Sequence, residues 1–174
     1  AWKNDNSELM AFLKTKRPIC VGYGSMPFSG LSAMLEALET VGHAALLVGE
    51  AMRLPQDNGS SNSSSEWVQE NVRQVDALPY AWLLPQCRMM LSHGGAGVLH
   101  ATLRAGIPSV ITPMMGDQFF WAKMVQAKGL GTQAGSMLST ATKDELVAAI
   151  KLALTTDCIE KARQFGEKLQ GYPK

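Results

Sequence analysis

The sequence lacks the features that mark several classes of protein. Its three cysteines are widely spaced and odd in number (Cys20, Cys87 and Cys158), which fits neither a disulfide framework nor a zinc site. No apolar run approaches the ~20 residues that cross a bilayer, and the start of the chain lacks the plan of a signal peptide. A formal charge of +1 provides no basic stripe for nucleic acid. We therefore expect a cytoplasmic protein with no metal, no nucleic-acid partner and no transmembrane segment.

What the chain does contain is the composition of one folded domain. Its 174 residues are 46% hydrophobic and 18% charged, somewhat below the typical ~25% charged. A single domain commonly has roughly 100 to 200 residues and buries a sizeable core at that size. We expect residues 1–174 to form one domain with its core at about 17–155. A Ser/Asn-rich stretch at 57–65 predicts a flexible surface loop.

Short apolar runs alternate along the chain with segments of helical periodicity. The predicted strands are Ile19–Tyr23, Ala44–Val48, Val72–Val75, Met89–Ser92 and Ser109–Thr112. The predicted helices are Ser7–Lys16, Leu31–Thr40, Ala96–Ala105, Asp117–Lys128, Thr142–Thr155 and Cys158–Leu169, the last of them polar. Such alternation predicts an α/β fold, a Rossmann-like parallel sheet with helices on both faces, whose ligands bind at the carboxyl ends of the strands.

The most informative segment is Ser92–Gly97, with the sequence SHGGAG, in which a strand ends in a glycine-rich turn that opens onto a helix. Glycines let the backbone approach a ligand closely, and the free amides and dipole of a helix start favour an anion. His93 would stand beside that anion and donate a hydrogen bond to a phosphate oxygen. The alternative is a structural histidine in a plain strand-to-helix turn.

Two further loops follow predicted strands. Gly24 and Ser25 lie in a glycine-rich loop after the first strand and could reach the same phosphates, although a plain turn is the alternative. Asp117 and Gln118 follow the strand that ends at Thr112. A carboxylate beside an amide suits vicinal sugar hydroxyls, which present donors and acceptors together. The alternative for Asp117 is helix capping.

Four segments in order carry a family resemblance: WLLPQ from Trp82, SHGGAG from Ser92, LRAGIPSVITP from Leu103 and GDQFFWA from Gly116. Together they resemble the sterol glucosyltransferase family. More broadly, they are similar to the C-terminal donor-binding domain of inverting glycosyltransferases of the GT-B fold, which have two Rossmann-like domains. The resemblance implies a UDP-sugar donor such as UDP-glucose, a sterol or other lipid-like acceptor, and no metal or cofactor.

By this resemblance, His93 would stabilise the leaving diphosphate together with the backbone at Ala96 and Gly97, while Trp82 and Leu83 would border the nucleobase. The implied donor-binding set is Gly24, Ser25, Trp82, Leu83, His93, Gly95, Ala96, Gly97, Val98, Asp117 and Gln118. Val98 departs from the family pattern, where a threonine hydroxyl usually assists the phosphate. Tyr80 and Ala81 also depart from it, because histidine and aspartate are common there in the sterol branch.

The resembling enzymes take their catalytic base and acceptor pocket from an N-terminal domain, and no segment before Ile19 is long enough to be one. We therefore expect this chain alone to bind a donor without turnover. It would be either part of a longer enzyme that is peripheral to membranes or a separate donor subunit that needs a partner chain. A degenerate nucleotide-sugar-binding module is the alternative without catalysis. A dinucleotide-dependent oxidoreductase is disfavoured, because neither glycine-rich loop completes the Gly-x-Gly-x-x-Gly/Ala fingerprint.

Overall fold

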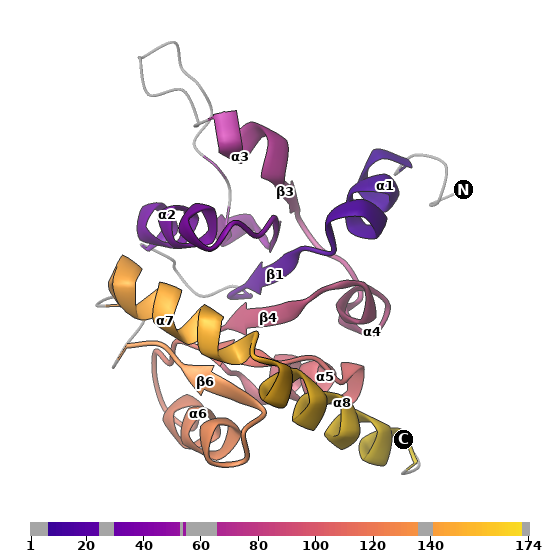
Figure 1. The fold of residues 1–174 in the computed structure, drawn as a ribbon, viewed down its shortest axis with the longest axis vertical. Coiled ribbons are helices and arrows are strands. Elements are labelled where there is room, and N and C mark those ends of the chain that lie inside the picture. The colour runs from indigo at the N-terminus through magenta and orange to yellow at the C-terminus, as the bar shows by residue number, and fades with distance from the viewer. Residues whose placement is uncertain (1–6, 25–29, 53, 55–65, 136–140, 172–174) are drawn as a thin grey trace.

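The computed structural model describes residues 7–24, 30–52, 54, 66–135 and 141–171, shown as ribbons in Figure 1. Two sequence predictions lie outside these ranges. Ser25 is one of them, and the Ser/Asn-rich loop at 57–65 is the other. All other residues of the predicted donor-binding set are described.

A six-stranded parallel sheet forms the centre of the molecule. Its strands are β1 (Ile19–Gly22), β2 (Ala45–Val48), β3 (Val72–Val75), β4 (Met89–Ser92), β5 (Ser109–Ile111) and β6 (Gly131–Gln133). Their order across the sheet is β3-β2-β1-β4-β5-β6 (Figure 1). The order reverses between β1 and β4, and a crevice opens at such a switch point outside the carboxyl ends of the strands.

Helices pack on both faces of the sheet, as the sequence predicts. The helices are α1 (Ser7–Lys16), α2 (Leu31–Val41), α3 (Glu66–Asn71), α4 (Tyr80–Leu83), α5 (Ala96–Ala105), α6 (Gln118–Ala127), α7 (Lys143–Ala153) and α8 (Thr156–Gln170), with short 3-10 turns η1 (Glu50–Met52) and η2 (Leu84–Gln86). Alternate residues of one strand show the two faces. Val21 faces a core with Met34 of α2 and Ile150 of α7, whereas Cys20 faces a core with Leu13 of α1 and Leu83 of α4.

Five elements were not predicted from the sequence: β6, α3, α4, η1 and η2. The strand β6 pairs with β5 and completes the sheet on that side. The segment from Pro79 to Gln86, between the strands predicted at 72–75 and 89–92, contains the short helix α4 and the turn η2. The Rossmann-like architecture is therefore confirmed, with one more strand than the apolar runs indicated.

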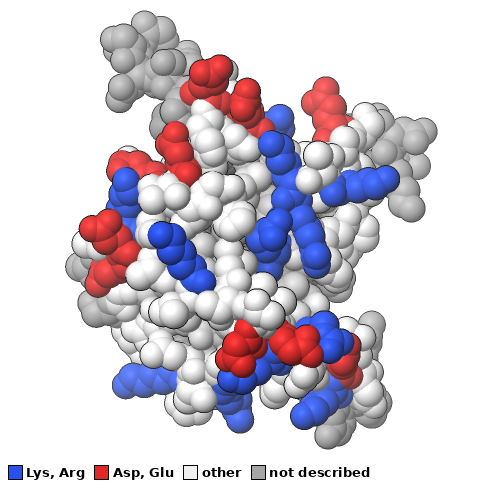
Figure 2. All heavy atoms as spheres, viewed as in Figure 1, with Lys and Arg blue, Asp and Glu red and all other residues white. Residues whose placement is uncertain are grey.

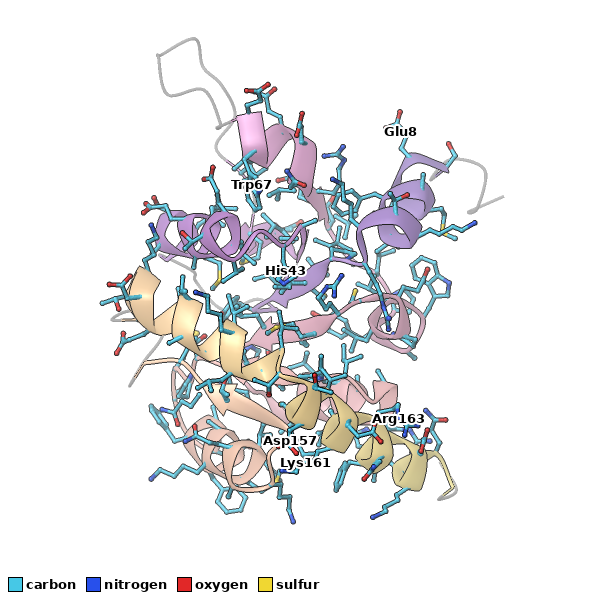
Figure 3. All side chains as sticks on the ribbon, viewed as in Figure 1. Glu8, His43, Trp67, Asp157, Lys161 and Arg163 are labelled. Atoms are coloured by element: carbon cyan, nitrogen blue, oxygen red, sulfur yellow. The ribbon has the colours of Figure 1, made fainter. Side chains whose placement is uncertain are left out.

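Two glycines bring α8 directly against α5. Gly106 ends α5 in a left-handed conformation, with φ 68°. A Cβ placed on Gly166 of α8 would lie 2.5 Å from the Gly106 Cα, so the two backbones touch without side chains between them. The outer face of α8 carries ion pairs, among them Asp157 with Lys161 at 2.7 Å (Figure 3). The helix is thus polar outside, as predicted, and closely packed inside.

Candidate functional site

The turn after β4 requires glycine at its second position, residue 94. Gly94 has φ 82°, and a Cβ there would lie 2.6 Å from Cγ2 of Ile111, a fully buried residue of β5. The Gly94 amide donates to Ser92 Oγ at 3.2 Å, and Ser92 O accepts from the Thr112 amide at 2.9 Å. These bonds hold the turn at the level where β4 and β5 end. The glycine-rich segment predicted from the sequence therefore lies at the switch point of the sheet.

The N-terminus of α5 points into this crevice without a side-chain cap. Gly95 is the N-cap residue, and among the described residues no side chain caps the first turn. The Leu99 amide donates to Gly95 O at 3.0 Å, so the amides of Ala96, Gly97 and Val98 precede the first intrahelical bond. Ala96 and Gly97 are exposed. Unpaired amides at the positive end of a helix dipole form an anion site.

His93 lies across the start of this helix. Its Nε2 is 2.5 Å from the position that a Gly95 Cβ would occupy, so the ring covers the backbone of the N-cap residue. The Nδ1 atom is buried and has no hydrogen-bond partner among the described residues. Burial lowers the pKa of His93 below 6.5, while the Asp117 carboxylate acts to raise it. The ring is therefore mostly neutral at pH 7, and an anion bound beside it would favour its protonated form.

Tyr23 forms the floor beneath His93, a role that the sequence did not indicate. Its ring centroid is 6.2 Å from that of His93, and its hydroxyl is hydrogen-bonded to Thr112 Oγ1 at 2.6 Å. Both bonded residues are fully buried, and burial raises the pKa of Tyr23. Because Tyr23 follows β1 and Thr112 follows β5, this bond joins the two strand ends on either side of β4.

Asp117 and Gln118 begin α6 and use their side chains differently. The Asp117 side chain makes no capping bond to its helix, which rules out the capping role in this structure. Its Oδ2 instead accepts from Trp121 Nε1 at 2.9 Å. Gln118 is buried, and its Oε1 accepts from the amides of Met114 at 2.8 Å and Met115 at 3.1 Å. The pair is thus left with carboxylate acceptors on Asp117 and amide donors on Gln118.

A hollow of about 770 Å³ opens beside Gly24, at the carboxyl ends of β1, β2 and β3. Gly49, Asp76, Leu78 and Tyr80 also line it. Trp82 and Leu83 do not: Trp82 packs against the core on the α4 side, and the Leu83 side chain is completely buried there. Leu83 therefore offers no exposed surface to a ligand in this arrangement. The residues just before Trp82 therefore border the crevice more closely than Trp82 does.

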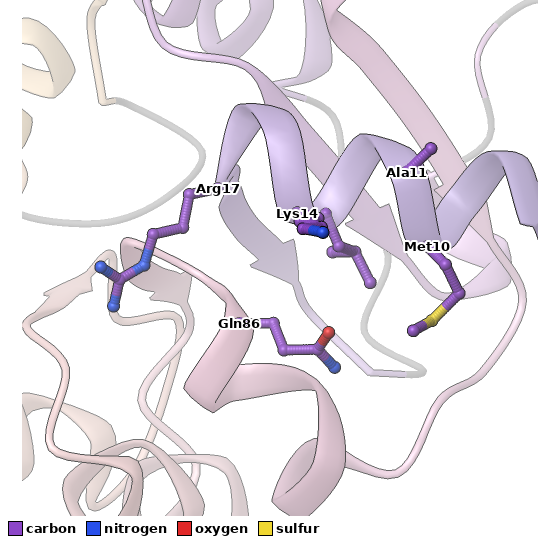
Figure 4. Close-up of a pocket in the computed structure, with 6 residues that line it drawn as sticks. Met10, Ala11, Lys14, Arg17 and Gln86 are labelled. Carbon is purple, nitrogen blue, oxygen red and sulfur yellow. The ribbon is translucent and has the colours of Figure 1, made fainter.

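A second hollow, of about 450 Å³, lies away from these residues (Figure 4). It separates α1 from η2 and is lined by Met10, Lys14, Arg17 and Gln86. Arg17 precedes β1, so this hollow lies near the amino ends of the strands, on a side where lysine and arginine side chains gather (Figure 2). None of the predicted donor-binding residues lines it. We therefore place the candidate site at the carboxyl ends.

Comparisons with known proteins agree with this fold. The family model for the erythromycin biosynthesis protein CIII-like C-terminal domain matches residues 42–171. The chain belongs to this family of glycosyltransferase C-terminal domains. A sterol 3-beta-glucosyltransferase of Arabidopsis thaliana is 30% identical over 157 residues, which cover 88% of this chain and 24% of that protein. An uncharacterized glycosyltransferase of Mycobacterium tuberculosis is 33% identical over 152 residues, covering 87% and 35%.

Solved structures give the same fold. The spinosyn forosaminyltransferase SpnP superposes with a TM-score of 0.70 at 20% identity, over 92% of this chain and 41% of that one. The glycosyltransferase VinC in complex with dTDP gives a TM-score of 0.68 at 20% identity, over 91% and 39%. These are glycosyltransferases of the GT-B fold, and this chain spans less than half of each. The predicted fold class and family are therefore confirmed.

In this glycosyltransferase domain, the two departures from the family pattern have clear positions. Val98 is half-buried and packs against the core beneath α5, so it offers an anion its amide and no side-chain donor. The Tyr80 hydroxyl lies 2.6 Å from where a Gly22 Cβ would be, and burial raises the pKa of Tyr80 to about 12. Tyr80 thus fills space beside the end of β1 that a smaller side chain would leave open.

The other histidines of the glycosyltransferase domain lie outside the site. His100 is exposed on α5. His43 lies just before β2, near the amino ends of the strands (Figure 3). Burial and the nearby Arg88 both lower the pKa of His43. The described residues contain no group of three or more His, Cys, Asp or Glu side chains that could hold a metal, and none of the described helices is long and apolar enough to cross a membrane.

Proposed function

We propose that this glycosyltransferase domain binds a UDP-sugar, with UDP-glucose as the preferred donor, and supplies the sugar to a sterol or another lipid-like alcohol. One observation carries the proposal: the uncapped N-terminus of α5, with its exposed amides at Ala96 and Gly97 and the His93 ring across its start. This arrangement suits a diphosphate. The similarity to a sterol 3-beta-glucosyltransferase supports the choice of donor and acceptor.

In the proposed reaction, the acceptor oxygen attacks the anomeric carbon while the bond from that carbon to the diphosphate oxygen breaks. The bonding electrons move onto the diphosphate, where negative charge grows. The amides of α5 and the imidazole of His93 would stabilise this charge. In other glycosyltransferases a metal ion performs that stabilisation. A base supplied by another domain or a partner subunit would take the acceptor proton. The step inverts the anomeric carbon.

The remaining residues fit the two ends of such a donor. Asp117 would accept hydrogen bonds from sugar hydroxyls, and the Gln118 amide would donate to them. The hollow beside Gly24, of about 770 Å³, has room for a nucleoside. Asp76 and Tyr80 line it at the same edge of the sheet. Ser25 would support the phosphates, as predicted from the sequence. A lipid-like acceptor would bring the full-length enzyme to a membrane surface from the cytoplasmic side.

A separate or degenerate donor-binding subunit is the second candidate, and Val98 favours it. The half-buried valine gives the diphosphate no hydroxyl donor at the first turn of α5. A separate subunit would bind UDP and UDP-glucose and would transfer the sugar only together with its partner chain, whereas a degenerate module would bind both without transfer. The two candidates therefore share the binding site and differ in catalysis.

The test is isothermal titration of the 174-residue chain with UDP-glucose, UDP and NADH. His93→Ala is expected to weaken UDP and UDP-glucose alike, by about tenfold or more, because it removes a hydrogen bond to a charged group. Asp117→Ala is expected to weaken UDP-glucose and leave UDP unchanged. His100→Ala, on the exposed face of the same helix, is the matched control. Binding of NADH in place of both uridine nucleotides would refute the proposal.

A further inference from the structure

The Asp117 carboxylate is held by a side chain rather than by the helix that it precedes. An aspartate at an N-cap usually accepts from a backbone amide of the first turn. Here Asp117 has helical backbone angles, φ −69° and ψ −12°, and its side chain makes no such bond. One carboxylate oxygen is bonded to Trp121 Nε1 instead, at 2.9 Å. The carboxylate is therefore directed across the surface of α6 at the edge of the site.

Trp121 is well suited to hold that carboxylate. It lies one turn further along α6, and its backbone amide also donates to Asp117 O at 3.0 Å. The indole is half-buried, packs against the core beneath α6, and meets the Phe120 ring edge-on with centroids 5.1 Å apart. An indole N–H is a donor only, so it can fix the carboxylate and cannot compete with it for a sugar hydroxyl.

We propose that Trp121 is a positioning residue for the sugar: it holds Asp117 Oδ2 so that Oδ1 remains available to accept from a sugar hydroxyl. This inference rests on the proposed function and adds a residue to it. Gln118 completes the arrangement, because its oxygen is already bonded to the amides of Met114 and Met115 and only its amide donors are left. The site then presents one fixed acceptor beside one fixed donor, which selects sugars with a matching pair of hydroxyls.

Two substitutions separate the hydrogen bond from the bulk of the ring. Trp121→Phe keeps an aromatic ring in the α6 core and removes the donor. Trp121→Gln removes the ring and keeps a donor, since a Gln amide reaches an Asp one turn away on a helix. Trp67→Phe is the control for an equal change elsewhere, because Trp67 is half-buried on α3, remote from α6 (Figure 3).

The first measurement needs no ligand. In the free chain, the Trp121 indole proton is expected to exchange slowly with solvent and to shift in the NMR spectrum when Asp117 is changed to Asn. The second measurement is titration with UDP-glucose and with UDP. Trp121→Phe is expected to weaken UDP-glucose about tenfold and UDP by less than twofold, and Trp121→Gln to recover most of the loss. In an Asp117→Ala background, Trp121→Phe is expected to have no further effect.

The outcomes distinguish this inference from the proposed function. Equal weakening of UDP and UDP-glucose by Trp121→Phe, or a lower unfolding temperature with unchanged affinities, would overturn the positioning role alone. An indole proton that does not respond to Asp117→Asn would also overturn it. If the unsubstituted chain does not bind UDP-glucose at all, the proposed function fails and the inference fails with it.

Discussion

Two adjacent glycines should respond to the same substitution in opposite ways. A Cβ on Gly94 would lie 2.6 Å from Ile111 Cγ2, and Gly94 has φ 82°. The left-handed backbone costs a non-glycine residue about 1–2 kcal/mol, and overpacking a stiff, buried isoleucine costs about 1–3 kcal/mol more. Gly94→Ala is therefore expected to lower the free energy of unfolding by about 2–5 kcal/mol. For a domain of this size that is a fall in Tm of roughly 4–20 °C.

Gly95→Ala should leave the fold nearly intact and disable the site. Gly95 has φ −59° and ψ 143°, angles that alanine accepts readily. Its Cβ would lie 2.5 Å from His93 Nε2, the far end of a side chain that can rotate away. We expect a loss of at most about 1 kcal/mol in unfolding free energy, typical of alanine at an N-cap. Moving the imidazole from the helix start should weaken UDP by about ten- to a hundredfold.

Urea unfolding and isothermal titration with UDP, applied to both variants, provide the test. The expected pattern is a destabilised Gly94→Ala and a stable Gly95→Ala that binds UDP poorly. The reasoning is refuted if Gly95→Ala binds UDP with the affinity of the unsubstituted chain. It is equally refuted if the two variants have the same urea midpoint, because the backbone angle and the contact with Ile111 would then have no measurable cost.

Three other predictions concern the floor of the site, its pH response and the α5–α8 contact. Tyr23→Phe leaves the buried Thr112 hydroxyl without its partner at 2.6 Å and should lower the free energy of unfolding in urea by about 1–3 kcal/mol. The double variant Tyr23→Phe with Thr112→Val should be closer to neutral, because no buried hydroxyl is left unpaired. Equal losses in the single and double variants would contradict this. Burial lowers the pKa of His93, so below pH 6.5 the unfolded chain binds a proton more readily than the folded chain. The free energy of unfolding should therefore fall as the pH drops from 6.5 toward the lowered pKa of His93. The affinity for UDP-glucose should rise over the same range, because a bound anion favours the protonated ring. A His93→Gln variant that keeps both pH responses would exclude this histidine as their source. Gly166→Ala, whose Cβ would lie 2.5 Å from the Gly106 Cα, should lower Tm through overpacking of about 1–3 kcal/mol, whereas Gly171→Ala, 3.4 Å from the nearest atom, should not.

The architecture could be predicted from the sequence because β1, β2, β4 and β5 are short, mostly apolar runs with glycine or proline nearby, and β3 begins and ends with valine. The strand β6 was missed because its sequence, Gly-Thr-Gln, has no apolar residue. Tertiary contact defines it: a Cβ on Gly131 would lie 1.8 Å from Ser109 O, so only glycine allows this approach to β5. The helix α3 was missed because its six residues, EWVQEN, are mostly polar and follow a serine-rich run.

The sequence predicted which loops form the candidate site, but it did not predict the side-chain hydrogen bonds within the site. The glycines around His93 and the pair Asp117 and Gln118 follow strands, and strand order alone brings β4 and β5 side by side. Nothing in the sequence shows that Trp121 would take the Asp117 carboxylate, or that Tyr23 would bond Thr112 across 89 positions. Those contacts depend on side-chain directions that only the packed structure fixes.

The last helix carries no predicted chemistry of its own, yet it packs against the helix that carries the proposed anion site. The helix α5 is about 15 Å long, from ten residues at about 1.5 Å each. One end holds the exposed amides, and the other is pressed backbone to backbone against α8 through Gly106 and Gly166. Because the two ends belong to one continuous helix, a change of tilt at the α8 contact would also displace the amides at the other end. Substitutions in α8 at this contact are therefore expected to alter the proposed diphosphate site from the other end of α5.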